Sequence, residues 1–320
     1  MYTVAHLSDV HLPTPPVPGI RALLNKRLLG YLSWQLRRRH NHRPEVLDAL
    51  QRDLQIQAPD HIAVTGDLTN ISLPAEFRQA AKWLAQLGPP ERVTVIPGNH
   101  DAYIPLPWAE SWSHWASYMG SETAEGESIA HTGFEDFPLV RRRGSVAIVG
   151  LTSAIPTKIG MASGSLGKRQ AALFKDRLGE LDKEGLFRIV LIHHPPIAGT
   201  TKPRKSLVDG ELFHDAIESA GAELVLHGHD HRFELGDLTS PHGPVPVVGV
   251  ASASAVRGTE KTPASQYHLY DIERTGDGWT MGWRTREFDA ISGRFTHLGT
   301  TTVSFQRVPP AEQLDPIDLI

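Results

Sequence analysis

The sequence predicts an α/β fold in which two β-sheets lie between layers of helices. Helix-like and strand-like segments alternate through the first half of the chain, whereas the segments beyond residue 244 are strand-like. This order indicates two sheets that share helices on the outside. At 320 residues the chain is long enough to bury a large core, and α/β folds of this length often form one domain. We expect a single domain over residues 1–306 and a C-terminal tail over residues 307–320.

The individual elements are predicted from apolar periodicity and from the positions of proline and glycine. Short β-prone runs predict strands at residues 2–7, 61–65, 93–96, 189–192 and 224–226. Helical spacing predicts helices at residues 44–57, 74–87, 168–183 and 210–220. Pro74 suits a first helical position and Gly221 a position just past a helix end. A hairpin is predicted over residues 137–150, and later strands at residues 245–251, 267–272, 279–288 and 300–305.

Polar motifs directly follow five of the predicted strands. They are Asp9-Val10-His11, Gly66-Asp67, Gly98-Asn99-His100-Asp101, His193-His194 and Gly228-His229-Asp230-His231. Because the strands of an open α/β sheet end side by side, side chains just beyond those ends converge in space. Asp9 and His11 alternate on a segment predicted to be extended, so both should point the same way. The sequence therefore predicts one polar site at the carboxyl edge of the strands.

The donor types at this site favour divalent transition metals. Carboxylate, amide oxygen and imidazole suit manganese, iron, cobalt or zinc, and the chain has no cysteine to supply a thiolate. Seven side chains are more than one ion with an open position can use, but they suit two ions that share a carboxylate. The candidate metal ligands are Asp9, His11, Asp67, Asn99, His193, His229 and His231.

The ordered motifs resemble those of the calcineurin-like metallophosphoesterase superfamily, which read D-x-H, G-D, G-N-H-D, H and G-H-x-H. Two longer stretches, Gly66-Asp67-Leu68-Thr69-Asn70 and His193-His194-Pro195-Pro196, are similar to the class III cyclic-nucleotide phosphodiesterase branch. The resemblance covers nearly the whole chain, and no ligand of the family pattern is missing. It implies a four-layer α/β/β/α sandwich (two mixed sheets flanked by helices) and a site with two divalent metal ions.

The resemblance also implies a role for each metal ligand. Asp67 would bridge the two ions, and Asn99 would bind the second of them. His229 would reach the same ion as Asn99, whereas His231 would reach the ion on the side of the first motif.

The neighbours of these ligands are assigned in the same way. In the pair His193-His194 the family pattern makes His193 the ligand, although spacing alone does not choose between them. His194, Asn70 and His227 are then expected to surround the ligands or to face the substrate.

The activity that the resemblance implies is hydrolysis of a phosphoester, and we expect a phosphodiesterase. Two ions roughly 3.5–4 Å apart can clamp the attacking and leaving oxygens, so that a hydroxide bridging them attacks phosphorus. His100, the histidine of G-N-H-D, would donate a proton to the leaving oxygen. Asp101 would orient the His100 ring. The alternatives are a hydrolase of a phospholipid or a nucleotide-linked lipid such as UDP-diacylglucosamine, and a non-catalytic membrane-binding or protein-binding scaffold.

A basic amphipathic helical insertion is predicted over residues 17–43. No acidic residue lies between Asp9 and Glu45, whereas apolar residues alternate with basic ones; the basic residues are Arg21, Lys26, Arg27, Arg37, Arg38, Arg39 and Arg43. Three interpretations remain open. Residues 20–43 could contact an anionic membrane, attract anionic substrates or polynucleotide, or form a cap or oligomer contact with solvated charges.

Composition is that of an ordinary globular protein. The net charge of −4 and 40% hydrophobic residues do not favour broad binding to nucleic acid. No signal-peptide pattern and no apolar run of membrane-spanning length are visible. We therefore expect a cytoplasmic protein, with the insertion as the part that could lie against the inner membrane surface, and a small-molecule or lipid phosphoester as its substrate.

Overall fold

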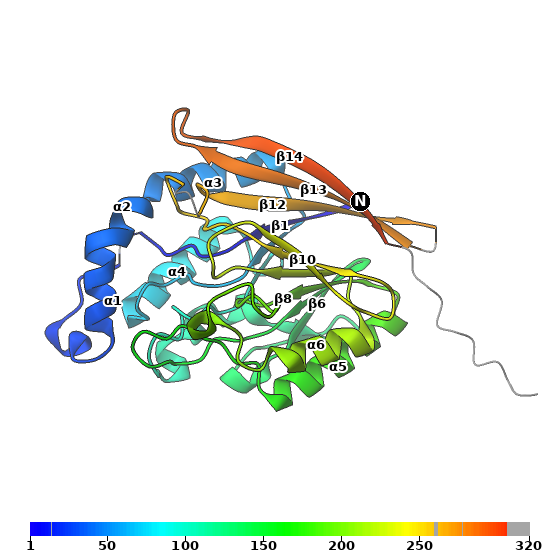
Figure 1. Cartoon of the computed structure of the whole chain (residues 1–320), viewed down its shortest axis with the longest axis horizontal. Helices are drawn as coiled ribbons and strands as arrows, with labels where there is room; N and C mark the ends of the chain where they lie inside the picture. Colours follow the sequence, from blue (N-terminus) through cyan, green and yellow to red (C-terminus); the bar gives the residue numbers. More distant parts are fainter. Residues whose placement is uncertain (14, 259–261, 277, 306–320) are drawn as a thin grey trace, which may run out of the picture.

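The computed structural model describes residues 1–13, 15–258, 262–276 and 278–305, so the predicted tail lies outside the described residues. Two six-stranded sheets pack face to face, and helices cover both outer faces (Figure 1). The predicted four-layer α/β/β/α sandwich is therefore confirmed.

The first sheet has the strand order β14-β13-β12-β1-β2-β3. Its members are β1 (Tyr2–Leu7), β2 (His61–Val64), β3 (Val93–Val95), β12 (Gln266–Thr275), β13 (Gly278–Asp289) and β14 (Arg294–Phe305). Strands β1, β2 and β3 run parallel, whereas β12 pairs antiparallel with β1.

The second sheet has the order β10-β11-β9-β8-β7-β6. Its members are β6 (Leu139–Arg143), β7 (Val146–Gly150), β8 (Phe187–Leu191), β9 (Leu224–His227), β10 (Glu234–Leu238) and β11 (Val245–Gly249). Strands β7, β8, β9 and β11 are parallel, and a separate two-stranded sheet joins β4 (Ser121–Glu122) to β5 (Ser128–Ile129).

The four main helices have the bounds that the sequence predicts. They are α3 (Pro44–Gln57), α4 (Pro74–Leu87), α5 (Lys168–Lys183) and α6 (Gly210–Ala220). Proline starts α3 and α4, because its fixed φ suits the first turn and its missing N–H is not needed there. Helix α3 packs on the first sheet, and the apolar faces of α5 and α6 cover the second; Phe174 and Phe213 stack there with ring centroids 5.4 Å apart.

The insertion is helical, as predicted, but it is broken into short pieces. They are a 3-10 turn η1 (Ile20–Leu23), α1 (Arg27–Ser33), a π-helical turn η2 (Trp34–Arg38) and α2 (Arg39–Asn41). It lies at the end of the molecule toward which β1 runs (Figure 1). Other short helical turns are η3 (Trp108–Glu110), η4 (Trp112–Met119), η5 (Phe134–Asp136) and η6 (Pro203–Lys205).

Several strands differ from the prediction, among them β14 and β10. Strand β14 begins at Arg294 rather than at residue 300, because its first half pairs with β13 in a hairpin. Strand β10 was not predicted; it is an edge strand with Gly236 and Asp237 in its sequence, residues that rarely occur in strands.

Candidate metal centre

The candidate site lies where parallel strands from both sheets end. The segment after β1 is tied to the segment after β2, because the Asp9 N–H donates to the Gly66 carbonyl at 3.0 Å. It is tied to the second sheet by the His229 N–H, which donates to Asp9 Oδ2 at 2.9 Å. Five motifs spread over 220 residues thus meet at one edge.

Two glycines permit this close approach. A Cβ atom on Gly98 would lie 2.3 Å from Asp67 Oδ1, and one on Gly228 would lie 1.9 Å from Ser8 Oγ. Real Cβ contacts are never so short, so any side chain at either position would push the polar residues apart.

The candidate ligands occupy an uncommon backbone conformation. Asp9, His11, Asp67, His229 and His231 all have positive φ, between 39° and 74°. The prediction of an extended segment at Asp9 and His11 is therefore wrong, although the two side chains do approach each other. Left-handed backbone at non-glycine residues is unfavourable and persists where the surrounding structure enforces it, which is typical of functional sites.

One group of donors consists of Asp9, His11 and His231. His231 Nε2 lies 3.1 Å from Asp9 Oδ1 and 3.2 Å from His11 Nε2. His11 Nε2 is 3.9 Å from Asp9 Oδ1. All three can offer one atom to a common ion.

The second group consists of Asn99, His193 and His229. Asn99 Oδ1 lies 3.1 Å from His193 Nε2 and 2.8 Å from His229 Nδ1. The carboxylate of Asp67 lies between the two groups, with Oδ2 3.8 Å from His11 Nε2 and 3.5 Å from His193 Nε2.

The chemistry of these donors fits divalent cations. Burial lowers the pKa of His11 and of His229, which favours the neutral imidazole that binds a metal. Within the described residues, His229 Nε2 is buried without a hydrogen-bond partner, and a buried imidazole nitrogen with a free lone pair is suited to bind a cation. Burial opposes protonation of His193, but Asp67 and Asp9 raise its pKa to about 9, which reflects the negative charge gathered at the site.

Backbone carbonyls fix two of the rings. His193 Nδ1 lies 2.7 Å from the Thr65 oxygen, and His11 Nδ1 lies 3.2 Å from the Thr69 oxygen. A carbonyl only accepts, so each Nδ1 carries a hydrogen, and Nε2 is the nitrogen that faces the site. Metal-binding histidines are commonly oriented in this way.

The residues expected around the ligands have distinct positions. Both ring nitrogens of His194 already have protein partners, Ser153 Oγ at 2.7 Å and the Ala162 oxygen at 3.2 Å. Asn70 donates its side-chain amide to the Leu12 carbonyl at 2.9 Å. His227 lies against Gly249, with Nε2 4.0 Å from Glu234.

His100 and Asp101 are adjacent in sequence but do different things. His100 Nδ1 lies 2.5 Å from the Asn70 oxygen, which holds the ring in place. The Asp101 carboxylate instead accepts the backbone N–H groups of Gly98, Leu68 and Thr69 at 2.9–3.3 Å. The prediction that Asp101 orients the His100 ring is therefore wrong, because its oxygens shape the loops that carry the ligands.

Sequence reasoning did not single out Arg38, whose guanidinium reaches the site from the insertion. Its Nη2 lies 2.9 Å from His100 Nε2, while Tyr103 stacks on the same ring with centroids 5.6 Å apart. Lys26 in turn lies over Tyr103, 4.3 Å from the ring centroid. His42, at the end of the insertion, packs edge-on against His11 with centroids 5.0 Å apart.

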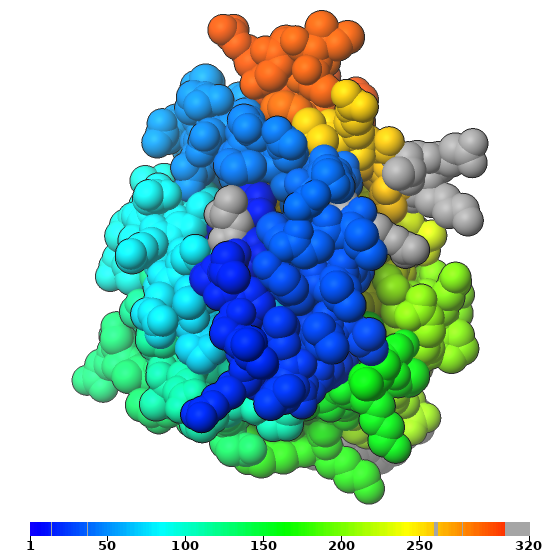
Figure 2. Space-filling model, turned by 90° about the vertical axis from the view of Figure 1, so that its left-hand side faces the viewer, coloured from blue at the N-terminus to red at the C-terminus, as the bar shows by residue number. Residues whose placement is uncertain are grey.

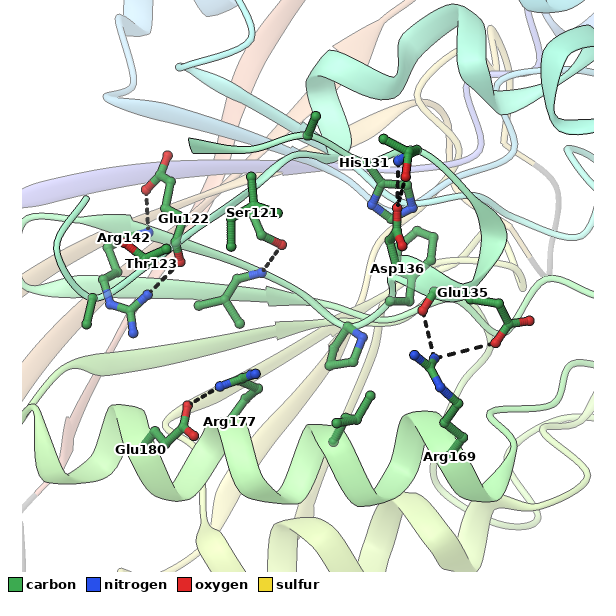
Figure 3. A pocket seen from close by; sticks show the side chains of 18 of the residues that line it. Ser121, Glu122, Thr123, His131, Glu135, Asp136, Arg142, Arg169, Arg177 and Glu180 are labelled. Atoms are coloured by element: carbon green, nitrogen blue, oxygen red, sulfur yellow. Dashed lines mark hydrogen bonds and ion pairs between the residues drawn. The ribbon is translucent and has the colours of Figure 1, made fainter. Parts of the chain in front are cut away.

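Two of the cavities in the described part of the chain lie outside the ligand set, one beside α5 and the other near the site. One of about 690 Å³ lies between the β4–β5 region and α5 (Figure 3), where Arg169 and Arg177 pair with Glu135 and Glu180. None of the candidate ligands lines it. The other, of about 540 Å³, shares Asp101 with the site and is lined by apolar side chains that include Trp112 and Ile155.

Comparison with known proteins agrees with this arrangement. The sequence profile of the calcineurin-like phosphoesterases matches residues 2–233. A Synechococcus protein described as a probable cyclic nucleotide phosphodiesterase is 26% identical over 233 residues, which cover 72% of this chain and 73% of the relative.

Solved structures share the fold. A dimetal phosphatase from Danio rerio superimposes with a TM-score of 0.57 at 12% identity, over 95% of this chain and 99% of that one. A purple acid phosphatase from yellow lupin (Lupinus luteus) seeds gives a TM-score of 0.59 at 12% identity, over 95% of this chain and 53% of the other. The profile match spans most of the chain, and the predicted family resemblance is confirmed: the chain belongs to the calcineurin-like phosphoesterase family.

Proposed function

We propose that the protein is a metal-dependent phosphodiesterase with two divalent ions. The observation that carries this proposal is the position of Asp67, whose carboxylate lies within 4 Å of histidines from both donor groups. Asp9, His11 and His231 would hold one ion, Asn99, His193 and His229 the other, and Asp67 would bridge them. Manganese, iron, zinc and cobalt all accept this donor set.

When bound, two such ions lower the pKa of a water toward neutrality and neutralise charge on the phosphoryl oxygens. Hydrolysis forms one P–O bond to the water-derived oxygen and breaks the P–O bond to the alcohol. The alcohol oxygen needs a proton as it leaves. His100 would supply it from Nε2, because Nδ1 is held by the Asn70 carbonyl; without substrate, Nε2 accepts from Arg38 Nη2 at 2.9 Å, and this contact has to give way before Nε2 can serve the leaving oxygen.

A diester is favoured over a monoester as substrate by two features. The stretches around Asp67 and His193 are similar to those of cyclic-nucleotide phosphodiesterases, and the Synechococcus relative is described as a probable enzyme of that kind.

The test is a manganese-supplemented screen of bis-p-nitrophenyl phosphate, p-nitrophenyl phosphate, cyclic nucleotides, glycerophosphodiesters and nucleotide-linked lipids. We expect the aryl diester to be cleaved faster than the aryl monoester. Faster cleavage of the monoester than of the diester would show that the protein is a phosphatase and not a diesterase. No cleavage of any compound, with vesicle binding retained, would favour a non-catalytic scaffold.

A second candidate is a lipid phosphoester hydrolase at the membrane surface, and the outer face of the insertion favours it. Its large apolar side chains are exposed instead of packed; they are Val17, Ile20, Leu24, Leu28, Leu29, Leu32 and Leu36. The insertion forms the middle of the face shown in Figure 2. Arg21 is exposed on the same segment, which lacks acidic residues, so the surface complements an anionic bilayer.

No helix in the described ranges is long and apolar enough to cross a bilayer. Peripheral binding through residues 20–43 would bring lipid headgroups to the edge of the candidate site, because the inner side of the same insertion contacts His100.

Replacing Leu24 and Leu36 with serine tests this surface. The two side chains are 78% and 74% exposed, so the double variant should fold normally. Binding to phosphatidylglycerol vesicles should weaken roughly tenfold or more, since each buried leucine contributes about 1.5–3 kcal/mol. Cosedimentation measures the binding, and hydrolysis of bis-p-nitrophenyl phosphate should not change.

The matched control replaces Ile56 and Ile291, which are 75% and 98% exposed elsewhere on the molecule, with serine. An equal loss of vesicle binding in both double variants would contradict the assignment of this surface. So would a parent protein that binds phosphatidylcholine vesicles as well as anionic ones, or one that binds no vesicles and forms dimers that the Leu24 and Leu36 changes dissociate.

A further inference from the structure

In the part of the chain that the structure describes, Arg38 is a cation inside the candidate site with no carboxylate at ion-pair distance. Its guanidinium is partly buried, and burial lowers its pKa below the ordinary arginine value. Within the described ranges, no carboxylate lies within ion-pair distance of it; Asp67 and Asp9 act on it only from farther away. A buried guanidinium without a counter-anion is unfavourable unless the site binds one.

The hydrogen bonds of Arg38 leave most of its donors unused. Its Nη2 donates to His100 Nε2 at 2.9 Å. The other close contact, Nη1 to His100 Nδ1 at 3.2 Å, cannot be a hydrogen bond while Nδ1 donates to the Asn70 carbonyl. An arginine has five N–H donors, so the Arg38 guanidinium can still bind a tetrahedral anion through two parallel hydrogen bonds.

The insertion is anchored so that Arg38 reaches this position. The buried Arg27 donates from Nε to the Ile71 carbonyl at 2.9 Å and also to the Ser72 carbonyl. Gly30 lets α1 approach the loop closely, because a Cβ there would lie 2.6 Å from Ile71 and 2.7 Å from Tyr103. The wide turn η2, which ends at Arg38, is of a type that often occurs at functional sites.

We propose that Arg38 binds the non-bridging phosphoryl oxygens of the substrate and thereby places the leaving oxygen against His100. This inference rests on the proposed phosphoesterase function and adds a substrate-binding residue supplied by the insertion. Binding a phosphoryl group would draw Arg38 from the His100 ring onto the anion, which frees Nε2 to take up a proton from solvent and pass it to the leaving oxygen. Guanidinium fits the group better than ammonium does, since its planar fork matches two phosphoryl oxygens.

The experiment compares Arg38→Gln and Arg38→Lys with a matched control, Arg39→Gln. Arg39 is the next residue and is exposed, and among the described residues its side chain bonds only to Gln35 and His40 of the insertion. In manganese-loaded protein, Arg38→Gln should raise the inhibition constant of inorganic phosphate and lower kcat/KM for bis-p-nitrophenyl phosphate, each about 10- to 100-fold. Arg38→Lys should recover part of both losses, and Arg39→Gln should match the parent.

Metal content should stay the same in all three variants, which separates lost phosphate binding from lost metal. Unchanged phosphate inhibition in Arg38→Gln, or an equal effect of Arg39→Gln, would overturn the assignment. If the parent protein hydrolyses no phosphoester, the proposed function is wrong, but this result does not decide whether Arg38 binds phosphate. Calorimetric titration of the manganese-loaded protein with phosphate would still test Arg38, with weaker binding by Arg38→Gln as the expected result and equal binding as the contrary one.

Discussion

Replacing Asp67 with alanine is expected to remove nearly all turnover and to lower metal content from two ions per chain to one or none. The reason is its position, since a single carboxylate faces histidines of both donor groups. Losing one preorganised stabiliser of transition-state charge typically costs about 10²–10³-fold in rate, and losing an ion should cost at least that much. Elemental analysis and initial rates measure the two effects.

The matched control is Asp48→Ala, because Asp48 is an exposed carboxylate on α3 outside the site. It should retain both the metal and the rate. An Asp67→Ala protein with unchanged metal content and rate would contradict the bridging role. Loss of rate with two ions retained would limit Asp67 to a role in orienting the substrate.

Replacing His100 with glutamine should slow hydrolysis by about 10²–10⁴-fold, the usual contribution of a general acid. Both metal ions should remain, because both ring nitrogens of His100 already have protein partners, the Asn70 carbonyl and Arg38, although the ring lies close to His11 and Asp67. The loss should be larger for an alkyl leaving group than for p-nitrophenolate, which leaves without a proton. Rates for the two diesters in parent and variant measure the difference.

His40→Gln is the control for this change, since His40 is exposed on the same insertion. It should leave both rates as in the parent. Equal losses for the alkyl and the nitrophenyl substrate in His100→Gln would argue against proton donation and for a role in binding alone.

The sequence predicts the helices well because their limits depend on local chemistry. Proline begins α3 and α4, and glycine follows α4 and α6, so that the ends are set by residues that can be read directly. Convergence of the five polar motifs is also predictable, because parallel strands must end at one edge.

Other features depend on contacts that only the folded chain has. The left-handed backbone of Asp9 and His11 is imposed by bonds to Gly66 and Asp67, which lie more than fifty residues away. The Asp101 carboxylate binds backbone amides of two separate loops. Its position next to His100 in the sequence therefore did not indicate its role.

Arg38 could not be distinguished from its neighbours by composition. Three arginines occur in succession, and only the packed insertion determines which of them enters the site. The same packing leaves the leucines of that segment outside, where the amphipathic pattern alone would equally allow a buried cap.

The most direct test of the two-ion centre is anomalous diffraction from crystals of the manganese-loaded protein. We predict two anomalous peaks roughly 3.5–4 Å apart. One should lie beside Asp9, His11 and His231, the other beside Asn99, His193 and His229, with Asp67 between them. A single peak, or peaks remote from Asp67, would contradict the account.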